Sequence, residues 1–269
     1  MTNPGLSRAF GLACVLLGVG STSCAASSGA APHEGPRPTV ASWRHARQRL
    51  STLEQTASRP RTMQISLSLR EPITRRTLES RGALAVAPPE SLRMILLGPG
   101  GTTSLDLWLQ ADRFRFAIPA IDLLRRGDSK TPKADIRGLP VDFLRWWLLR
   151  PTSGTLLWHV PDAEGDRFVL RDGPSIVDLR VARSGRVTAR RTTWEESSDK
   201  PGERRKIDDE SIDADRFGCG VVRYEQASTN LLVTVKCESE ETKRAPNPRA
   251  FVDPDAPETM LLLGGRVGS

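Results

Sequence analysis

Apolar and polar residues alternate along much of the chain, beginning near residue 63. Met63, Ile65, Leu67 and Leu69 are separated by polar residues, and this period of two is typical of a half-buried β-strand. Similar patterns predict further strands at residues 77–86, 92–97, 103–110, 113–118, 155–160, 167–171, 175–181, 186–194 and 206–212. Short turns join most of these segments, so we expect antiparallel pairing.

Three segments have helical patterns instead. In the first, apolar residues recur at helical spacing between Ser42, which suits an N-cap, and Arg59-Pro60, which ends the helix. Residues 119–126 predict a short helix. Residues 139–149 (LPVDFLRWWLL) are apolar nearly all round, which predicts a buried or half-buried helix.

With about eleven strands and two or three helices, the chain is expected to be an α+β protein. A sheet of this size curls or closes, so we expect a strongly curved antiparallel sheet that forms an incomplete β-barrel capped by the helices. The folded domain is expected at residues 42–240. Residues 241–269 are charged and rich in proline, and they are expected to be a loosely ordered tail.

One face of the predicted strands is apolar, and the opposite face is rich in Arg, Ser, Thr and Asp. At residues 155–160 the alternation places Leu156, Trp158 and Val160 on the apolar face and His159 on the outward face. Two interpretations of the apolar face stay open: an ordinary hydrophobic core, or a pocket for an apolar ligand inside an incompletely closed barrel. Periodicity does not separate them, because both need the same alternation.

The N-terminus is typical of an export signal. Residues 9–20 form a 12-residue apolar run, which is too short to span a bilayer. The small residues that follow end at Cys24 in a pattern that resembles a bacterial lipobox. We therefore expect residues 1–23 to be a lipoprotein signal peptide, Cys24 to be lipidated and residues 24–41 to be a flexible tether. Ala25 resembles an outer-membrane sorting signal, which favours a lipid anchor in the outer membrane with the domain facing the periplasm.

Two later cysteines, Cys219 and Cys237, flank a turn-like stretch centred on residue 228. A hairpin with that centre places the two cysteines opposite each other, and cross-strand neighbours are within reach of a disulfide. An exported domain also meets an oxidising environment. We therefore expect a disulfide between Cys219 and Cys237.

The chain offers little material for catalysis or metal binding. Its 269 residues include three His and four Cys, and no Gly-x-Ser-x-Gly or His-Glu-x-x-His motif. We therefore expect no catalytic residue, no metal and no cofactor. The acidic cluster at residues 208–215 lacks the residue order of a calcium loop. It is expected to be a solvated face, partly neutralised by Arg204, Arg205 and Lys206.

The positive charge is concentrated near the predicted anchor. The chain carries 39 Lys and Arg against 32 Asp and Glu, and residues 42–81 alone contain nine Arg and three acidic residues. An export signal and the absence of interleaved aromatic residues argue against a nucleic-acid partner. This charge is expected to form a solubilising arginine-rich face, and attraction to anionic lipid head groups is the alternative.

A longer set of motifs resembles the LolA/LolB-like group of periplasmic lipoprotein-localisation factors. Residues 81–97 (RGALAVAPPESLRMILL), a Gly-Pro-Gly turn and residues 105–119 follow that group's order of two strands, a turn and two more strands. Residues 138–147 (GLPVDFLRWW) resemble the Leu-Pro helix of the LolB branch. The resemblance spans roughly residues 42–237 and implies an open barrel capped by helices.

By this resemblance, an apolar cavity takes acyl chains or the lipid moiety of a lipoprotein. The residues expected to line it are Leu67, Leu69, Leu84, Val86, Met94, Leu96, Leu107, Phe114, Phe116 and Trp146. The turn at residues 98–102 (GPGGT) has no apolar tip, whereas the LolB receptor inserts an exposed leucine into the membrane at the corresponding turn.

The function expected from the sequence is the binding of lipid, or of the acyl chains of another lipoprotein, by a non-enzymatic membrane-anchored lipoprotein. The alternative is a structural or accessory lipoprotein of a cell-envelope complex whose barrel core is filled. The two differ in whether the apolar interior accepts a guest.

Overall fold

The structure of the chain, a computed structural model, describes residues 39–70, 75–132, 135–136, 138–161, 163–196 and 202–255. The predicted signal peptide, Cys24 and nearly all of the predicted tether lie outside these residues, as does the end of the tail. The unit described below begins at Val40. None of the helices in the described part of the chain has the length and hydropathy needed to cross a bilayer.

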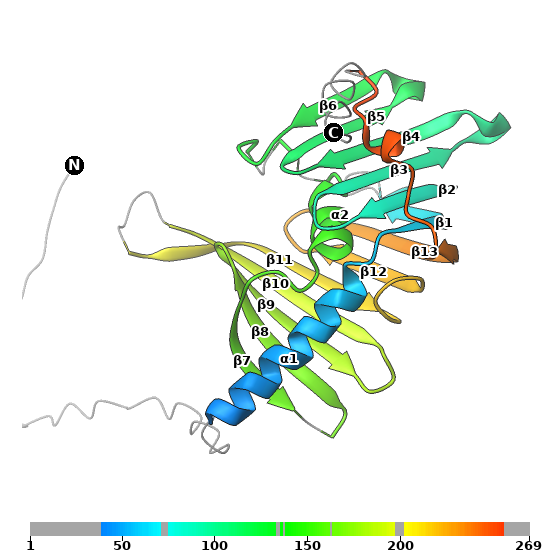
Figure 1. Cartoon of the computed structure of the whole chain (residues 1–269). Coiled ribbons are helices and arrows are strands. Elements are labelled where there is room, and N and C mark those ends of the chain that lie inside the picture. The colour runs from blue at the N-terminus through cyan, green and yellow to red at the C-terminus, as the bar shows by residue number, and fades with distance from the viewer. Residues whose placement is uncertain are drawn as a thin grey trace, which may run out of the picture. The chain divides into compact units, whose positions relative to one another are not determined.

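Thirteen strands form one antiparallel sheet in the described part of the chain (Figure 1). They are β1 (Arg61–Arg70), β2 (Thr77–Ala87), β3 (Ser91–Leu97), β4 (Thr103–Gln110), β5 (Arg113–Ile118), β6 (Leu123–Gly127), β7 (Thr155–Pro161), β8 (Gly165–Asp172), β9 (Ser175–Ala182), β10 (Val187–Glu196), β11 (Arg204–Ala214), β12 (Val221–Gln226) and β13 (Leu231–Glu241). Their order is β6-β5-β4-β3-β2-β1-β13-β12-β11-β10-β9-β8-β7. The sheet is open, with β6 and β7 at its two edges, and the predicted antiparallel pairing is confirmed.

The strand count exceeds the expected eleven in part because residues 119–126 are not a helix. Only Pro119–Ile121 form a single 3-10 turn, η2, and Asp122 then adopts a left-handed conformation with φ of 52°. This residue ends the turn and reverses the chain, so that β6 pairs with β5. A short apolar segment is ambiguous between helix and strand, and here the open edge of β5 decides it.

The helices lie on the apolar side of the sheet. α1 (Val40–Ala57) extends from the β7 edge toward α2 (Val141–Leu144), which continues as one π-helical turn, η3 (Arg145–Leu149) (Figure 1). All residues of α2 and η3 are buried except Asp142 and Arg145, which agrees with the buried helix predicted at residues 139–149. Two further 3-10 turns are η1 (Pro99–Gly101) and η4 (Pro248–Phe251).

A β-bulge in β7 reverses the predicted faces of the residues that follow it. The register with β8 shifts between Leu156 and Trp158, so one extra residue enters β7 and the alternation reverses after it. Leu156 is buried as predicted, but Trp158 is 59% exposed and Val160 37% exposed. The side chain of His159 lies on the buried side instead, where it stacks on Phe168.

The C-terminal segment also differs from the loosely ordered tail expected from residue 241. Residues 242–255 follow β13, and η4 contacts β3 and β4 on the polar face of the sheet (Figure 1). The indole Nε1 of Trp108 donates to the carbonyl oxygen of Phe251 at 2.7 Å, and Arg115 Nε donates to Asp255 at 2.7 Å. The charged residues of this segment thus find partners on the sheet that the sequence does not reveal.

The predicted disulfide is confirmed. Cys219 and Cys237 are bonded, with their Cα atoms 5.1 Å apart. In the hairpin of β12 and β13, Gln226 pairs with Leu231, so its centre lies between residues 228 and 229, half a residue from the expected position. The bond joins the bend before β12 to the middle of β13.

Candidate functional site

The ten residues predicted to line a cavity gather on the apolar side of the sheet. Nine of them come from β1 to β5, where cross-strand pairs such as Leu84 with Met94 and Leu107 with Phe116 place them on one face. The tenth, Trp146, comes from η3. Nine of the ten are at most 4% exposed, and Leu69 is half-buried. The structure therefore places all ten in one hydrophobic cluster, as the alternation required.

Aromatic side chains of α2 and η3 cover the middle of this face. Phe143 stacks on Tyr224 of β12, with ring centroids 4.5 Å apart. Trp147 stacks on Phe217 at 5.3 Å. Trp146 lies under the guanidinium of Arg191, 4.5 Å from the ring centroid. The sequence pattern does not identify these partners, because they come from segments about 45 to 80 residues further along the chain.

A buried ion pair lies beside Trp146. Arg191 of β10 donates from Nε and Nη2 to the two carboxylate oxygens of Glu210 in β11, both at 2.6 Å, and the Tyr224 hydroxyl donates to Glu210 Oε1 at 2.7 Å. Burial lowers the pKa of Arg191, but the hydrogen bonds and charge of Glu210 outweigh this and hold it above its ordinary value. Burial and the Glu210 charge raise the pKa of Tyr224. This group is a fixed, charged structural contact among the buried residues of this face.

The acidic cluster at residues 208–215 is therefore not the solvated face that was expected. Because strand residues alternate between faces, Asp208 and Glu210 are buried, and Asp209 and Asp213 lie on the polar face. Lys206 does contact Asp209, at 3.2 Å, as predicted. The main partners of the cluster are Arg186, directly before β10, and Arg190 and Arg191 of β10. The signal that could have found two of them is a shared spacing of four residues, between Arg186 and Arg190 and between Asp209 and Asp213.

Like α2 and η3, α1 lies over the apolar side of the sheet, but few of its residues are buried there. Only Ala46 and Ala57 of α1 are buried, and three larger residues, Trp43, Leu50 and Leu53, are half-buried against the core. One ion pair ties the helix to the sheet: Arg49 Nη2 donates to Asp166 Oδ2 at 2.7 Å.

Asp166 also binds a neighbour on β7. Its Oδ1 accepts a hydrogen bond from His159 Nε2 at 2.9 Å. Burial alone would raise the pKa of Asp166, but the hydrogen bonds from Arg49 and His159 lower it below its ordinary value. The carboxylate therefore stays charged and holds α1 to the start of β8. The position of His159 on this buried side follows from the bulge in β7 and could not be read from the alternation.

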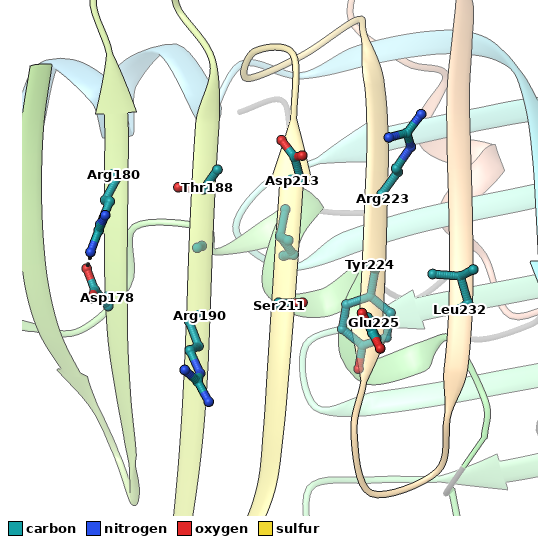
Figure 2. A pocket seen from close by; sticks show the side chains of 12 residues that line it. Asp178, Arg180, Thr188, Arg190, Ser211, Asp213, Arg223, Tyr224, Glu225 and Leu232 are labelled. Atoms are coloured by element: carbon teal, nitrogen blue, oxygen red, sulfur yellow. Dashed lines mark ion pairs between the residues drawn. The ribbon is translucent and has the colours of Figure 1, made fainter. Parts of the chain in front are cut away.

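The polar face of the sheet carries shallow grooves. One groove of about 530 Å³ crosses β9 to β13, and Figure 2 shows its side chains alternating in charge along neighbouring strands, with Asp178 beside Arg180 and Asp213 on the strand next to Arg223. Further grooves of about 310 and 640 Å³ lie on the same face beside β1, β2 and β13. The ion pairs of this face, such as Arg186 with Asp213, are open to solvent. In the part of the chain that the structure describes, no group of three or more His, Cys, Asp or Glu is arranged to hold a metal ion.

Comparison with known proteins finds similarity to solved structures. No family model matches the chain, and no curated protein matches it. Solved structures of similar fold include a LolA superfamily protein from Nitrosomonas europaea, with 11% identity and a TM-score of 0.46, covering 76% of this chain and 96% of that one. A domain described as an outer membrane lipoprotein-sorting protein, from Vibrio parahaemolyticus, has 10% identity and a TM-score of 0.45, covering 76% of this chain and 94% of that one. A DUF1329 family protein from Desulfovibrio piger has 12% identity and a TM-score of 0.41, with 79% and 98% covered.

Proposed function

We propose that this chain is a non-enzymatic lipoprotein of the cell envelope, anchored at Cys24 in the outer membrane and facing the periplasm. In this proposal the apolar side of its sheet takes lipid, or the acyl chains of another lipoprotein. The guest lies between the sheet and the helices, and no cofactor or metal takes part.

The observation that supports lipid binding is the contrast between a large apolar face and a lightly attached cover. The buried apolar residues of β1 to β5 and of β8 to β10 belong to one continuous cluster. α1 covers part of this cluster with two buried alanines, three half-buried side chains and one ion pair to Asp166. Moving α1 would expose mainly apolar side chains, and apolar surface of this kind is favourably covered by hydrocarbon.

The route for a guest follows from the same contacts. Because α1 spans from the β7 edge toward α2, its displacement opens the apolar side next to η3 (Figure 1). An acyl chain entering there would meet the hydrophobic cluster that contains Trp146 and the predicted residues on β1 to β5. The Arg191–Glu210 pair stays buried, with the guanidinium over the Trp146 ring.

A specific observation also favours the alternative, an accessory lipoprotein with a filled core. Nine of the ten predicted lining residues are already at most 4% exposed, packed against each other and against η3. In that case the sheet is a rigid platform and its polar face carries the contacts to an envelope complex.

Photocrosslinking in intact cells separates the two. Cells that express the full chain are grown with a diazirine-labelled fatty acid and irradiated, and crosslinked peptides are mapped by mass spectrometry. Lipid binding predicts crosslinks on β3 to β5, in peptides that contain Met94, Leu107 or Phe116. Phe116→Asp should abolish these crosslinks while the disulfide still forms, and Phe116→Leu should retain them. Crosslinks confined to Cys24 peptides and to surface residues would favour the accessory role.

A further inference from the structure

The two edges of the sheet are protected very differently. β6 carries Arg125 and Arg126, and the latter is paired with Asp253 and Asp255 of the C-terminal segment. β7, at the other edge, is seven residues long and contains no Asp, Glu, Lys or Arg (TLLWHVP). Edge strands usually carry charges or are covered, because an apolar edge invites association. The β7 edge has a bulge and Pro161 in place of charges, and its exposed apolar side chains call for an explanation.

The bulge in β7 presents apolar side chains at this edge. Leu157 is the extra residue and is 48% exposed, and Trp158 is 59% exposed. Val160 follows at 37%. Without the bulge, Trp158 and Val160 would lie on the buried side, as the alternation predicted. The bulge thus brings a tryptophan and two aliphatic residues to the rim of the sheet.

The neighbouring half of α1 is basic. Between Val40 and Leu53 the helix contains three arginines and no acidic residue. Arg49 is paired with Asp166, whereas Arg44 and Arg47 are exposed. Because Asp166 at the start of β8 is opposite Pro161 of β7, the Arg49 contact holds this basic half of α1 beside the β7 edge (Figure 1). Exposed apolar side chains and exposed arginines therefore occur at the same edge of the sheet, the apolar ones on the face opposite α1.

The number of residues between Cys24 and the start of α1 indicates which edge of the sheet is near the membrane. Fifteen residues separate Cys24 from Val40, and a chain of that length reaches at most about 50 Å when fully extended. The 13 strands have 12 spacings of about 4.8 Å each, or about 58 Å along the sheet. A tether that ends at the start of α1 therefore keeps the β7 edge, and not the β6 edge, close to the lipid surface.

We propose that the β7 edge rests on the phospholipid surface, with Leu157, Trp158 and Val160 at the level of the head groups and Arg44 and Arg47 against anionic phosphates. Tryptophan is favoured at this depth because its ring is apolar and its N–H finds polar partners there. The backbone groups of the edge strand stay hydrated at the same depth. This inference rests on the anchor at Cys24 proposed above, and it is independent of whether the apolar face carries lipid.

The test uses the acylated protein, reconstituted into vesicles of phosphatidylethanolamine and phosphatidylglycerol. Cys219 and Cys237 are bonded to each other, and Cys24 is blocked by its thioether, so a single new cysteine can be labelled with an environment-sensitive fluorophore. Trp158→Cys is compared with Trp194→Cys, which replaces a tryptophan that is 37% exposed on β10. We expect a blue shift and quenching by nitroxide-labelled lipid at position 158 and neither at position 194. Adding Arg44→Glu and Arg47→Glu should reduce the quenching at position 158.

Three results would overturn the inference. Equal emission shifts and equal quenching at positions 158 and 194 on vesicle-bound protein would show that the β7 edge does not face lipid. Label self-quenching at position 158 that depends on protein concentration and not on lipid would show that β7 pairs with a second copy. If the protein carries no acyl mass on Cys24 and does not float with vesicles, it has no lipid anchor, and the proposed membrane surface is wrong as well. A lack of crosslinks on β3 to β5 in the preceding experiment would leave the vesicle result unchanged.

Discussion

Arg49 in α1 and Asp166 in β8, 117 residues apart, are joined through a single carboxylate oxygen: Arg49 Nη2 lies 2.7 Å and Nε 3.2 Å from Asp166 Oδ2. The other oxygen of Asp166 is occupied by His159. This contact is the ion pair that fastens α1 to the strands at the β7 edge, and it contributes both to the cover of the apolar face and to the surface proposed to meet the membrane.

Arg49→Glu should loosen α1 without unfolding the sheet. Arg49 is about half exposed, so the lost pair is worth about 1 kcal/mol, or roughly a fivefold increase in helix opening. Amide hydrogen exchange in α1 measures this directly, and exchange in β12 and β13 should not change. Arg47→Glu makes the same change of charge on the exposed side of the helix and should leave exchange near the wild-type rate. Equal acceleration by both variants would show that total charge, and not the contact with Asp166, holds the helix.

Glu210→Ala should be among the most destabilising polar substitutions in the chain. It leaves the buried guanidinium of Arg191 without its bidentate partner and removes the acceptor of the Tyr224 hydroxyl. Breaking a buried pair on one side costs about 3–5 kcal/mol. Urea unfolding gives the free energy of unfolding. Asp213→Ala is the control, because its partner Arg186 is 62% exposed and the expected loss is below about 1 kcal/mol. Similar losses for both variants would contradict the role assigned to burial.

Tyr224 is the only tyrosine in the chain, so its ionisation can be followed by tyrosinate absorbance without interference. Burial and Glu210 raise its pKa in the folded protein, whereas an unfolded tyrosine ionises at about 10. The unfolded state therefore loses this proton first, and the free energy of unfolding should fall as pH rises above about 10. We expect tyrosinate to appear together with loss of circular dichroism. A titration near pH 10 in protein that stays folded would show that Tyr224 is accessible.

Asp209 should contribute to acid stability over a narrow range. A hydrogen bond from Arg190 lowers its pKa to about 2, from an ordinary value of 3.8. A lowered pKa means that the stabilisation is present above about pH 4 and is lost as pH falls toward 2. Wild type should therefore lose more unfolding free energy than Asp209→Asn between pH 4.5 and about 2.5. Chemical unfolding at a series of pH values tests this, and parallel curves for the two proteins would refute it.

Removal of the disulfide should destabilise the chain without changing its fold. Cys219 and Cys237 are separated by 18 residues, and closing a loop of that size stabilises a protein by about 3 kcal/mol through the unfolded state. The double variant Cys219→Ala with Cys237→Ala should show this loss in urea unfolding and keep its circular dichroism spectrum. Wild type in reducing buffer should match it. Loss of the β-sheet signal in native buffer would mean that the bond is required for folding.

Much of the candidate site follows from periodicity. Because strand side chains alternate with a period of two, the residues from Leu67 to Phe116 had to share a face once the strands paired antiparallel, and the structure places them in one cluster. The same reasoning fails where a single residue is inserted. The bulge at Leu156 and Trp158 moved His159 to the buried side and Trp158 to the surface, because one extra residue reverses every later position in the strand.

The sequence by itself determined the local pattern: alternating strands, a buried Leu-Pro helix and a cysteine pair symmetric about a turn. These are set by interactions between residues close in the chain or directly opposite in a hairpin. Only the tertiary structure decided which arginine meets Glu210, that the C-terminal segment lies on β3 and β4, and that η3 packs its tryptophans against residues far along the chain. Such contacts depend on how strands distant in sequence are ordered in the sheet, and many partners satisfy the same pattern of charge and hydrophobicity equally well.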